Sequence, residues 1–183
     1  PADWIGTIAS DLGEEGEEGD DIVFSACLTP DDYNIDNIDA DSAASWQLDA
    51  ESPFDGAEAS VEARVFADEA VATDAYAVLE KILGTDEGRE CLAKEAPGQL
   101  ALDAPAGTTF EGRVEGTTID GANVGVRLII SFNAGGAAGE IYVDLVAARY
   151  GTTCTIFASF TSFSAPVDQA IASAMFTAAL AAG

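Results

Sequence analysis

Histidine is absent from this chain, and its absence limits the chemistry that the other side chains could do. Without it there is no Ser-His-Asp or Cys-His pair, no histidine metal ligand and no histidine pH switch. The 33 Asp and Glu residues could supply carboxylate pairs of the kind that glycosidases use, but so many acids would do so by chance. No GxSxG, P-loop or GxGxxG motif is present. We therefore expect a non-enzymatic protein; an enzyme would need two carboxylates in one cleft.

An Asp-rich segment is the best candidate for a metal site. Asp32, Asn34 and Asp36 match positions 1, 3 and 5 of a calcium loop, and Asn37 could replace the glycine of position 6. Position 12, which needs a bidentate acid, falls on Ala43. The pattern favours a solvated loop over a Ca²⁺ site, and no other cofactor is expected.

Three arginines fall on predicted strands, each on the side opposite to the apolar residues of its own strand: Arg64, Arg113 and Arg127. Acids take similar outward positions, namely Glu62, Glu111, Glu115 and Asp144. One interpretation is a set of cross-strand ion pairs on a solvated sheet face. The other is a polar site whose arginines bind an anionic ligand. A net charge of −26 favours neutralisation of the arginines within the chain.

Three cysteines, at 27, 91 and 154, have no CxxC or CxxCH spacing, so the common zinc, haem and thioredoxin motifs are excluded. In an exported protein two of the three would pair. We expect a Cys91–Cys154 disulfide, with Cys27–Cys91 as the next choice. Three reduced cysteines in the core are the remaining alternative.

The charge balance restricts the partners and the compartment. A chain this acidic repels nucleic acid and anionic membrane surfaces, so we expect neither as a partner. No uninterrupted apolar run reaches 18 residues, so no membrane span is expected. Many acids with only two lysines suggest a saline or extracellular setting.

Apolar periodicity predicts strands in runs and two amphipathic helices. One helix covers 68–83, with Asp68 as its cap, and the other begins near Pro166. Strands are expected at 22–28, 45–50, 58–66, 109–116, 123–132, 139–149 and 152–162, with a helical turn at 86–95 and a connection over 96–108.

Short connections make the last four strands antiparallel neighbours. We expect an α+β fold: an antiparallel sheet of about five to six strands, in the order β-β-α-β-β-β-β-α, packed on one face by two helices. The reverse face would be charged but partly apolar, and would be covered by residues 1–50, a partner or a ligand. Its apolar members would be Ile129, Tyr142, Val146 and Phe157.

The N-terminal segment is predicted to form an arm. Trp4, Ile5, Ile8 and Leu12 have helical spacing, and an acidic, glycine-broken loop follows at 13–21. We expect residues 1–21 to form a helical arm that contacts a partner through Trp4, and residues 22–183 to form a single domain. The start at Pro1 would suit a processed protein or a trimmed one.

Three segments resemble actinobacterial secreted sensor-type and lipoprotein domains, such as PknH-like extracellular domains and LpqN-like lipoproteins. They are ACLTPDDY (26–33), the strand, Ala-rich helix and cysteine of 63–91, and the two strands and closing helix of 143–180. Cys27 and the strong acidity depart from that pattern. The resemblance implies an envelope-attached domain that binds an unknown ligand or partner, with no catalytic residues to carry over.

Together these features predict an extracellular or cell-envelope domain that binds a protein or small-molecule ligand. The working surfaces would be the sheet face around Arg64, Arg113 and Arg127, and the arm around Trp4. The alternative is a structural subunit of a surface assembly, a filament or shell, that uses the same arm and face to contact its neighbours.

Overall fold

A computed structural model of the chain describes residues 4–10, 27, 38–48, 56–102 and 104–182. The elements in chain order are the strands β1 (Trp4–Ser10), β2 (Ile38–Leu48) and β3 (Ala57–Phe66), the helices α2 (Glu69–Gly84) and α3 (Asp86–Leu102), the strands β4 (Thr109–Gly116), β5 (Val124–Ala134), β6 (Ala137–Tyr150) and β7 (Cys154–Phe163), and the helix α4 (Gln169–Ala182). The fold is α+β, as predicted, and no described helix combines the length and apolar character that a membrane crossing requires.

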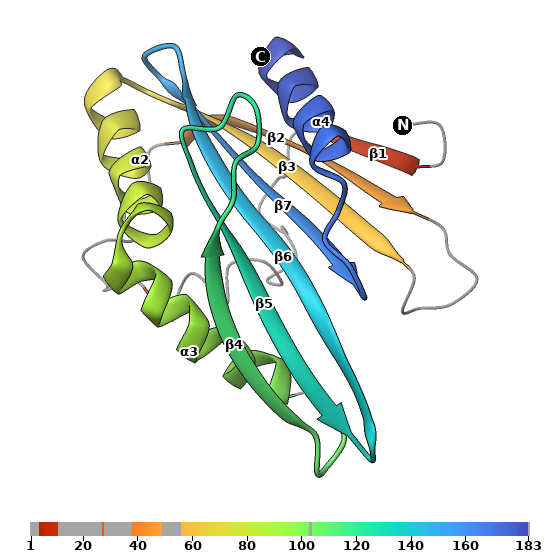
Figure 1. Ribbon diagram of the computed structural model, residues 1–183. Helices are drawn as coiled ribbons and strands as arrows, with labels where there is room; N and C mark the ends of the chain where they lie inside the picture. Colours follow the sequence, from red (N-terminus) through yellow and green to blue (C-terminus); the bar gives the residue numbers. More distant parts are fainter. Residues whose placement is uncertain (1–3, 11–26, 28–37, 49–55, 103, 183) are drawn as a thin grey trace.

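The strands form one seven-stranded antiparallel sheet in the order β1-β2-β3-β7-β6-β5-β4 (Figure 1). Tight turns join β5 to β6 and β6 to β7, where Gly135, Gly136 and Gly151 adopt positive φ. The predicted meander of the last four strands is therefore confirmed. The strand β3 pairs with β7 in antiparallel orientation, with Val61 opposite Ala158.

The first strand corrects a prediction, because residues 4–10 form an edge strand and not a helix. Trp4 pairs with Leu48 and Ser10 pairs with Ser42. The sequence of this segment, WIGTIAS, is rich in aromatic and β-branched residues, which suit a strand wherever a partner strand is available. The predicted strand over 22–28 lies outside the described residues apart from Cys27.

The helices lie on opposite faces of the sheet, whereas the sequence suggested one shared face. Helix α4 packs through Phe176 on Val61, Val146 and Phe160. Helix α2 packs through Ile82 and Leu83 on side chains of the other parity, namely Val126, Leu145 and Ala147. Neighbours such as Leu145 and Val146 point to opposite sides of a strand. In Figure 1 α4 crosses β3 and β7, and α2 and α3 run along the β4 side. We call the two surfaces the α4 face and the α2–α3 face.

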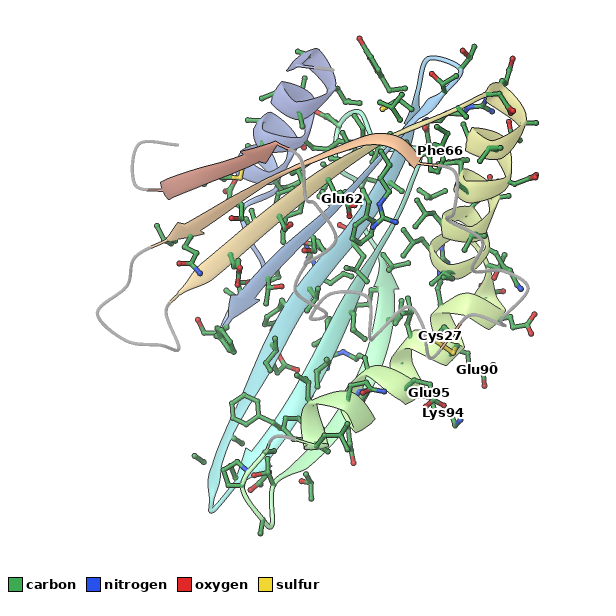
Figure 2. The ribbon with its side chains drawn as sticks, turned by 180° about the vertical axis from the view of Figure 1, so that it is seen from behind. Cys27, Glu62, Phe66, Glu90, Lys94 and Glu95 are labelled. Carbon is green, nitrogen blue, oxygen red and sulfur yellow. A yellow bond between two sulfur atoms is a disulfide. The ribbon has the colours of Figure 1, made fainter. Side chains whose placement is uncertain are left out.

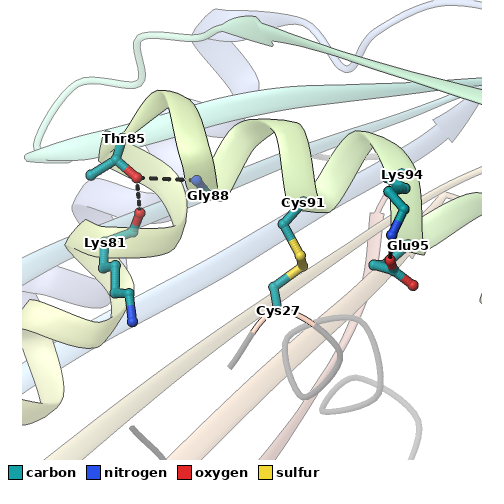
Figure 3. Close-up of a disulfide and its surroundings, with 7 residues drawn as sticks. All are labelled: Cys27, Lys81, Thr85, Gly88, Cys91, Lys94 and Glu95. Carbon is teal, nitrogen blue, oxygen red and sulfur yellow. Dashed lines mark hydrogen bonds and ion pairs between the residues drawn. A yellow bond between two sulfur atoms is a disulfide. The ribbon is translucent and has the colours of Figure 1, made fainter. Parts of the chain in front are cut away.

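The Thr85 side chain forms hydrogen bonds with both α2 and α3. The Thr85 hydroxyl donates to the Lys81 carbonyl oxygen at 2.5 Å, near the end of α2, and accepts from the Gly88 N–H at 3.1 Å, at the start of α3 (Figure 3). One side chain therefore satisfies a terminal carbonyl of one helix and a terminal N–H of the next. At the other end of α2, Asp68 caps the N–H groups of Ala70 and Val71, as the sequence predicted.

Helix α3 runs through Pro97 to Leu102, where the sequence suggested a loop. A proline at position 97 leaves the Ala93 carbonyl without its helical donor. That carbonyl lies against Gly112 of β4, where a Cβ would overlap it and would also come within 2.8 Å of Pro97 Cγ. The proline and the glycine together allow α3 to approach β4 closely.

Candidate functional site

The polar residues of β4, β5 and β6 that face the same way as α4 form two neighbouring groups of hydrogen bonds and ion pairs beyond the end of that helix. Register places Glu115, Arg127 and Asp144 in one row across the three strands, and Arg113, Ile129 and Tyr142 in the next. Ser131 and Glu140 are opposite each other in a third row. We call this set the arginine–carboxylate network: Arg113, Glu115, Arg127, Ser131, Glu140, Tyr142 and Asp144.

Its innermost part is a bidentate ion pair between Arg127 and the buried Asp144. Arg127 Nε donates to Asp144 Oδ1 at 2.8 Å, and Nη2 donates to Oδ2 at 2.9 Å. Asp144 is only 2% exposed, next to Phe160 of the core beneath α4. Two parallel hydrogen bonds are the strongest arrangement available to an arginine and a carboxylate, and they raise the pKa of Arg127. The guanidinium is thereby fixed in place.

Its outer part is centred on Glu140. Arg113 Nη1 donates to Glu140 Oε1 at 2.8 Å, and the Tyr142 hydroxyl donates to Oε2 at 2.5 Å. The Tyr142 hydrogen bond, followed by the contact with Arg113, lowers the pKa of Glu140. The same bond raises the pKa of Tyr142. Arg113 is half exposed, so solvent reaches this end of the network.

Arg64 does not join the other two arginines, which corrects the predicted grouping. It lies on the α2–α3 face, opposite Thr155 of β7, and forms an ion pair with Glu62. The apolar set of β3 faces α4, whereas the apolar set of β5 faces α2 and α3. Arg64 and Arg127 each point away from the apolar residues of their own strand. Because those apolar residues face opposite sides of the sheet, the two arginines also lie on opposite faces.

The sequence argument missed Glu140 and Ser131. Glu140, Tyr142 and Asp144 occupy alternate positions of β6, so they share one face. That spacing was the available signal, and the register with Arg113 and Arg127 could only come from the structure.

The disulfide is Cys27–Cys91, the second choice from the sequence, so the expected Cys91–Cys154 pair is wrong. The two Cα atoms are 5.8 Å apart, and Figure 2 shows Cys27 beside α3 near Glu90, Lys94 and Glu95. Cys154 is a free, buried cysteine in the core beneath α4, where burial raises the pKa of its thiol. The sheet separates it from Cys91, which lies in α3 on the other face.

The calcium candidate Asp32, Asn34 and Asp36 lies outside the described residues. In the ranges that are described, no group of three or more Cys, Asp or Glu side chains is arranged to hold a metal ion. For Trp4 the structure gives a place in the edge strand β1, paired with Leu48, and the predicted partner contact stays a prediction.

No family model matches the chain, and no curated protein matches it in sequence. Among solved structures, the chain is similar to the extracellular domain of PknH from Mycobacterium tuberculosis, with a TM-score of 0.42 and 8% sequence identity. The match covers 98% of this chain and 83% of that one.

Proposed function

We propose that this chain is a non-enzymatic domain that acts outside the cytoplasm and binds a protein partner through the arginine–carboxylate network. The proposal depends on one observation: helix α4 covers only the apolar part of the sheet face on which it lies. Where the α4 face is apolar, at Val146 and Phe160, the chain's own helix covers it. Where that face becomes polar, from Asp144 outward, its side chains are held by one another and solvent reaches Arg113.

Order within the network supports a binding role. Arginine and tyrosine are favoured at protein interfaces, and side chains that are already fixed lose less conformational entropy on binding. Arg127 is held by Asp144, and Tyr142 is held by Glu140. A partner would therefore meet a surface that is already arranged.

The charge of this surface favours a basic partner over an anion. Glu111 lies beside the network, opposite Ser131 of β5. With Glu111, the acids Glu115, Glu140 and Asp144 outnumber Arg113 and Arg127, and the whole chain carries −26. Both arginines already have carboxylate partners, so an anionic ligand would compete with bonds inside the chain. Lysine and arginine side chains of a partner would meet the surplus acids instead.

Three features support the remaining parts of the proposal. A disulfide is typical of exported proteins, which supports a place outside the cytoplasm. A general acid at neutral pH needs a raised pKa, whereas the pKa of Glu140 is lowered. The chain also has no histidine to serve as a base.

A basic peptide tests the proposed surface. A fluorescent deca-lysine peptide would be titrated with the wild type, with the triple variant E111Q/E115Q/E140Q, and with a matched control on the helices, E80Q/E87Q/E90Q. Each triple removes three negative charges. We expect the network variant to weaken binding about tenfold and the helix control about twofold or less. Equal losses in the two variants would show attraction to total charge only, and would overturn the assignment.

A further inference from the structure

Strand β4 forms one edge of the sheet in the described part of the chain, because the strand order ends there and β5 is its partner on one side only. It pairs with β5 over the whole of Thr109–Gly116 without a register shift, so it is a regular strand. Along such an edge, alternate residues direct their N–H and C=O groups away from the sheet. In Figure 1 β4 is the outermost strand on the side of α2 and α3. Its outer edge therefore offers backbone hydrogen bonds to an added strand.

The side chains of β4 alternate between the two faces of the sheet. Glu111, Arg113 and Glu115 are exposed and lie on the α4 face. Gly112 and Val114 lie on the other face, toward α3. A Cβ at Gly112 would meet the α3 backbone, and a Cβ points out of the plane of a sheet, so α3 lies against a face of β4. An added strand would thus meet charges on one face and apolar side chains on the other.

The charges on this edge select a basic occupant. Arg113 already has Glu140 as a partner at 2.8 Å, whereas the side chain of Glu115 is 58% exposed and lies 3.7 Å from Arg113. Opposite charges directly across from each other on neighbouring strands attract, and like charges destabilise the pair. The two glutamates of the edge therefore disfavour a second copy of this acidic chain. They favour a strand with lysine or arginine opposite Glu111 and Glu115.

We infer that a basic, extended segment of the partner protein adds to the outer edge of β4 as a further strand. This mode of binding rests on the function proposed above and specifies the conformation and sequence pattern of the partner. The segment carries Lys or Arg at two positions four residues apart and an uncharged polar residue midway, opposite Arg113. The residues between them are β-branched and face α3. Backbone hydrogen bonds supply the affinity, and the alternate side chains supply the specificity.

Hydrogen exchange of the full chain, with its disulfide intact, tests strand addition with the capped peptide TKVTVKT, which has this pattern. We expect saturating peptide to slow exchange at least about tenfold at alternate amides of β4, because those N–H groups gain a partner only when a strand is added. The amides of β1 (Trp4–Ser10), the edge strand at the other end of the sheet order, are the control. They should be unaffected, since β1 has no charged residue to attract the peptide.

Two N-methylated analogues make the test sharper, one methylated at both valines and the other at both lysines. Neighbouring residues of a strand direct their N–H groups to opposite sides, so only one analogue loses hydrogen bonds to β4. We expect that analogue to bind at least about tenfold more weakly than the other. The variant E111Q/E115Q should weaken binding of the unmodified peptide about fivefold or more, and the helix control E80Q/E87Q about twofold or less.

Equal binding of the two analogues, unchanged exchange in β4, or protection of β1 instead would each overturn strand addition at this edge. The deca-lysine titration separates such a failure from a failure of the proposed function. If E111Q/E115Q/E140Q still lost deca-lysine binding relative to its helix control, the binding surface would stand and only the added strand would be wrong. If the two triple variants lost it equally, the binding surface itself would be wrong.

Discussion

The two faces of β6 serve different purposes with alternate residues of one strand. On the α2–α3 face, Val143, Leu145 and Ala147 are apolar and lie beneath helices. On the α4 face, the polar residues Glu140, Tyr142 and Asp144 precede the apolar Val146 and Ala148. A helix covers each apolar stretch, and the polar stretch forms ion pairs instead. The α2–α3 face of the strand is therefore part of the core, and the polar half of the α4 face is the surface that we propose for binding.

The largest expected loss in the free energy of unfolding comes from removing the disulfide on the α2–α3 face. Replacing both Cys27 and Cys91 with serine opens a loop with a sequence separation of 64 residues, and the chain-entropy model gives a loss of about 4 kcal/mol. Urea unfolding would measure this loss. A control, Cys154→Ala, removes the free cysteine and should cost less, although it leaves a small cavity beneath α4.

Mass spectrometry gives the matching chemical test. Non-reducing digestion should yield a Cys27–Cys91 crosslinked peptide, and Cys154 should react with thiol reagents only after denaturant is added, because its thiol is buried. A Cys91–Cys154 peptide would contradict the separation of these two residues by the sheet.

The next largest effect is expected at the contact between α3 and β4. In Gly112→Ala the new methyl group would overlap the Ala93 carbonyl, so we expect a loss of about 2–3 kcal/mol in the free energy of unfolding. Gly116→Ala is the matched control, because a Cβ there meets no heavy atom within 4 Å. Equal losses for the two variants would mean that α3 does not lie against Gly112.

On the α4 face, the buried pair should matter more for stability than the exposed pair does. Asp144→Asn leaves Arg127 without its carboxylate, and we expect a loss of about 2 kcal/mol, reduced from the fully buried case because Arg127 is 25% exposed. Glu140→Gln acts at the solvent-exposed end and should cost less. A reversed order would contradict the division into an inner and an outer part.

The smallest effect is a titration. Because the folded protein lowers the pKa of Glu140, the associated stability is present above the unfolded pKa and is lost as pH falls through the folded value. Carboxyl NMR should find Glu140 titrating below an ordinary glutamate, and Tyr142→Phe should move its pKa back upward. An unchanged titration in that variant would show that the Tyr142 hydroxyl does not bond to Glu140 in solution.

Local patterns in the sequence predicted much of this architecture. The Asp68 cap, the α2 helix, the alternation of β3 and the short turns between the last four strands are encoded within a few residues, and the structure contains them. Pairing across the sheet is not encoded locally. Alternation shows that Arg64 and Arg127 each oppose an apolar set, but it does not reveal which face each set occupies. The cysteine pairing had the same difficulty, because it depends on which side of the sheet each cysteine lies.

Backbone amide NMR during a deca-lysine titration at physiological salt tests the binding surface most directly. The account predicts that the largest shift changes fall on Glu111, Arg113, Glu115, Glu140 and Tyr142, with smaller changes on the acidic surface of α2 and α3. Changes spread evenly over all exposed acids, or concentrated on the helices, would contradict the assignment of the open half of the α4 face as the binding surface.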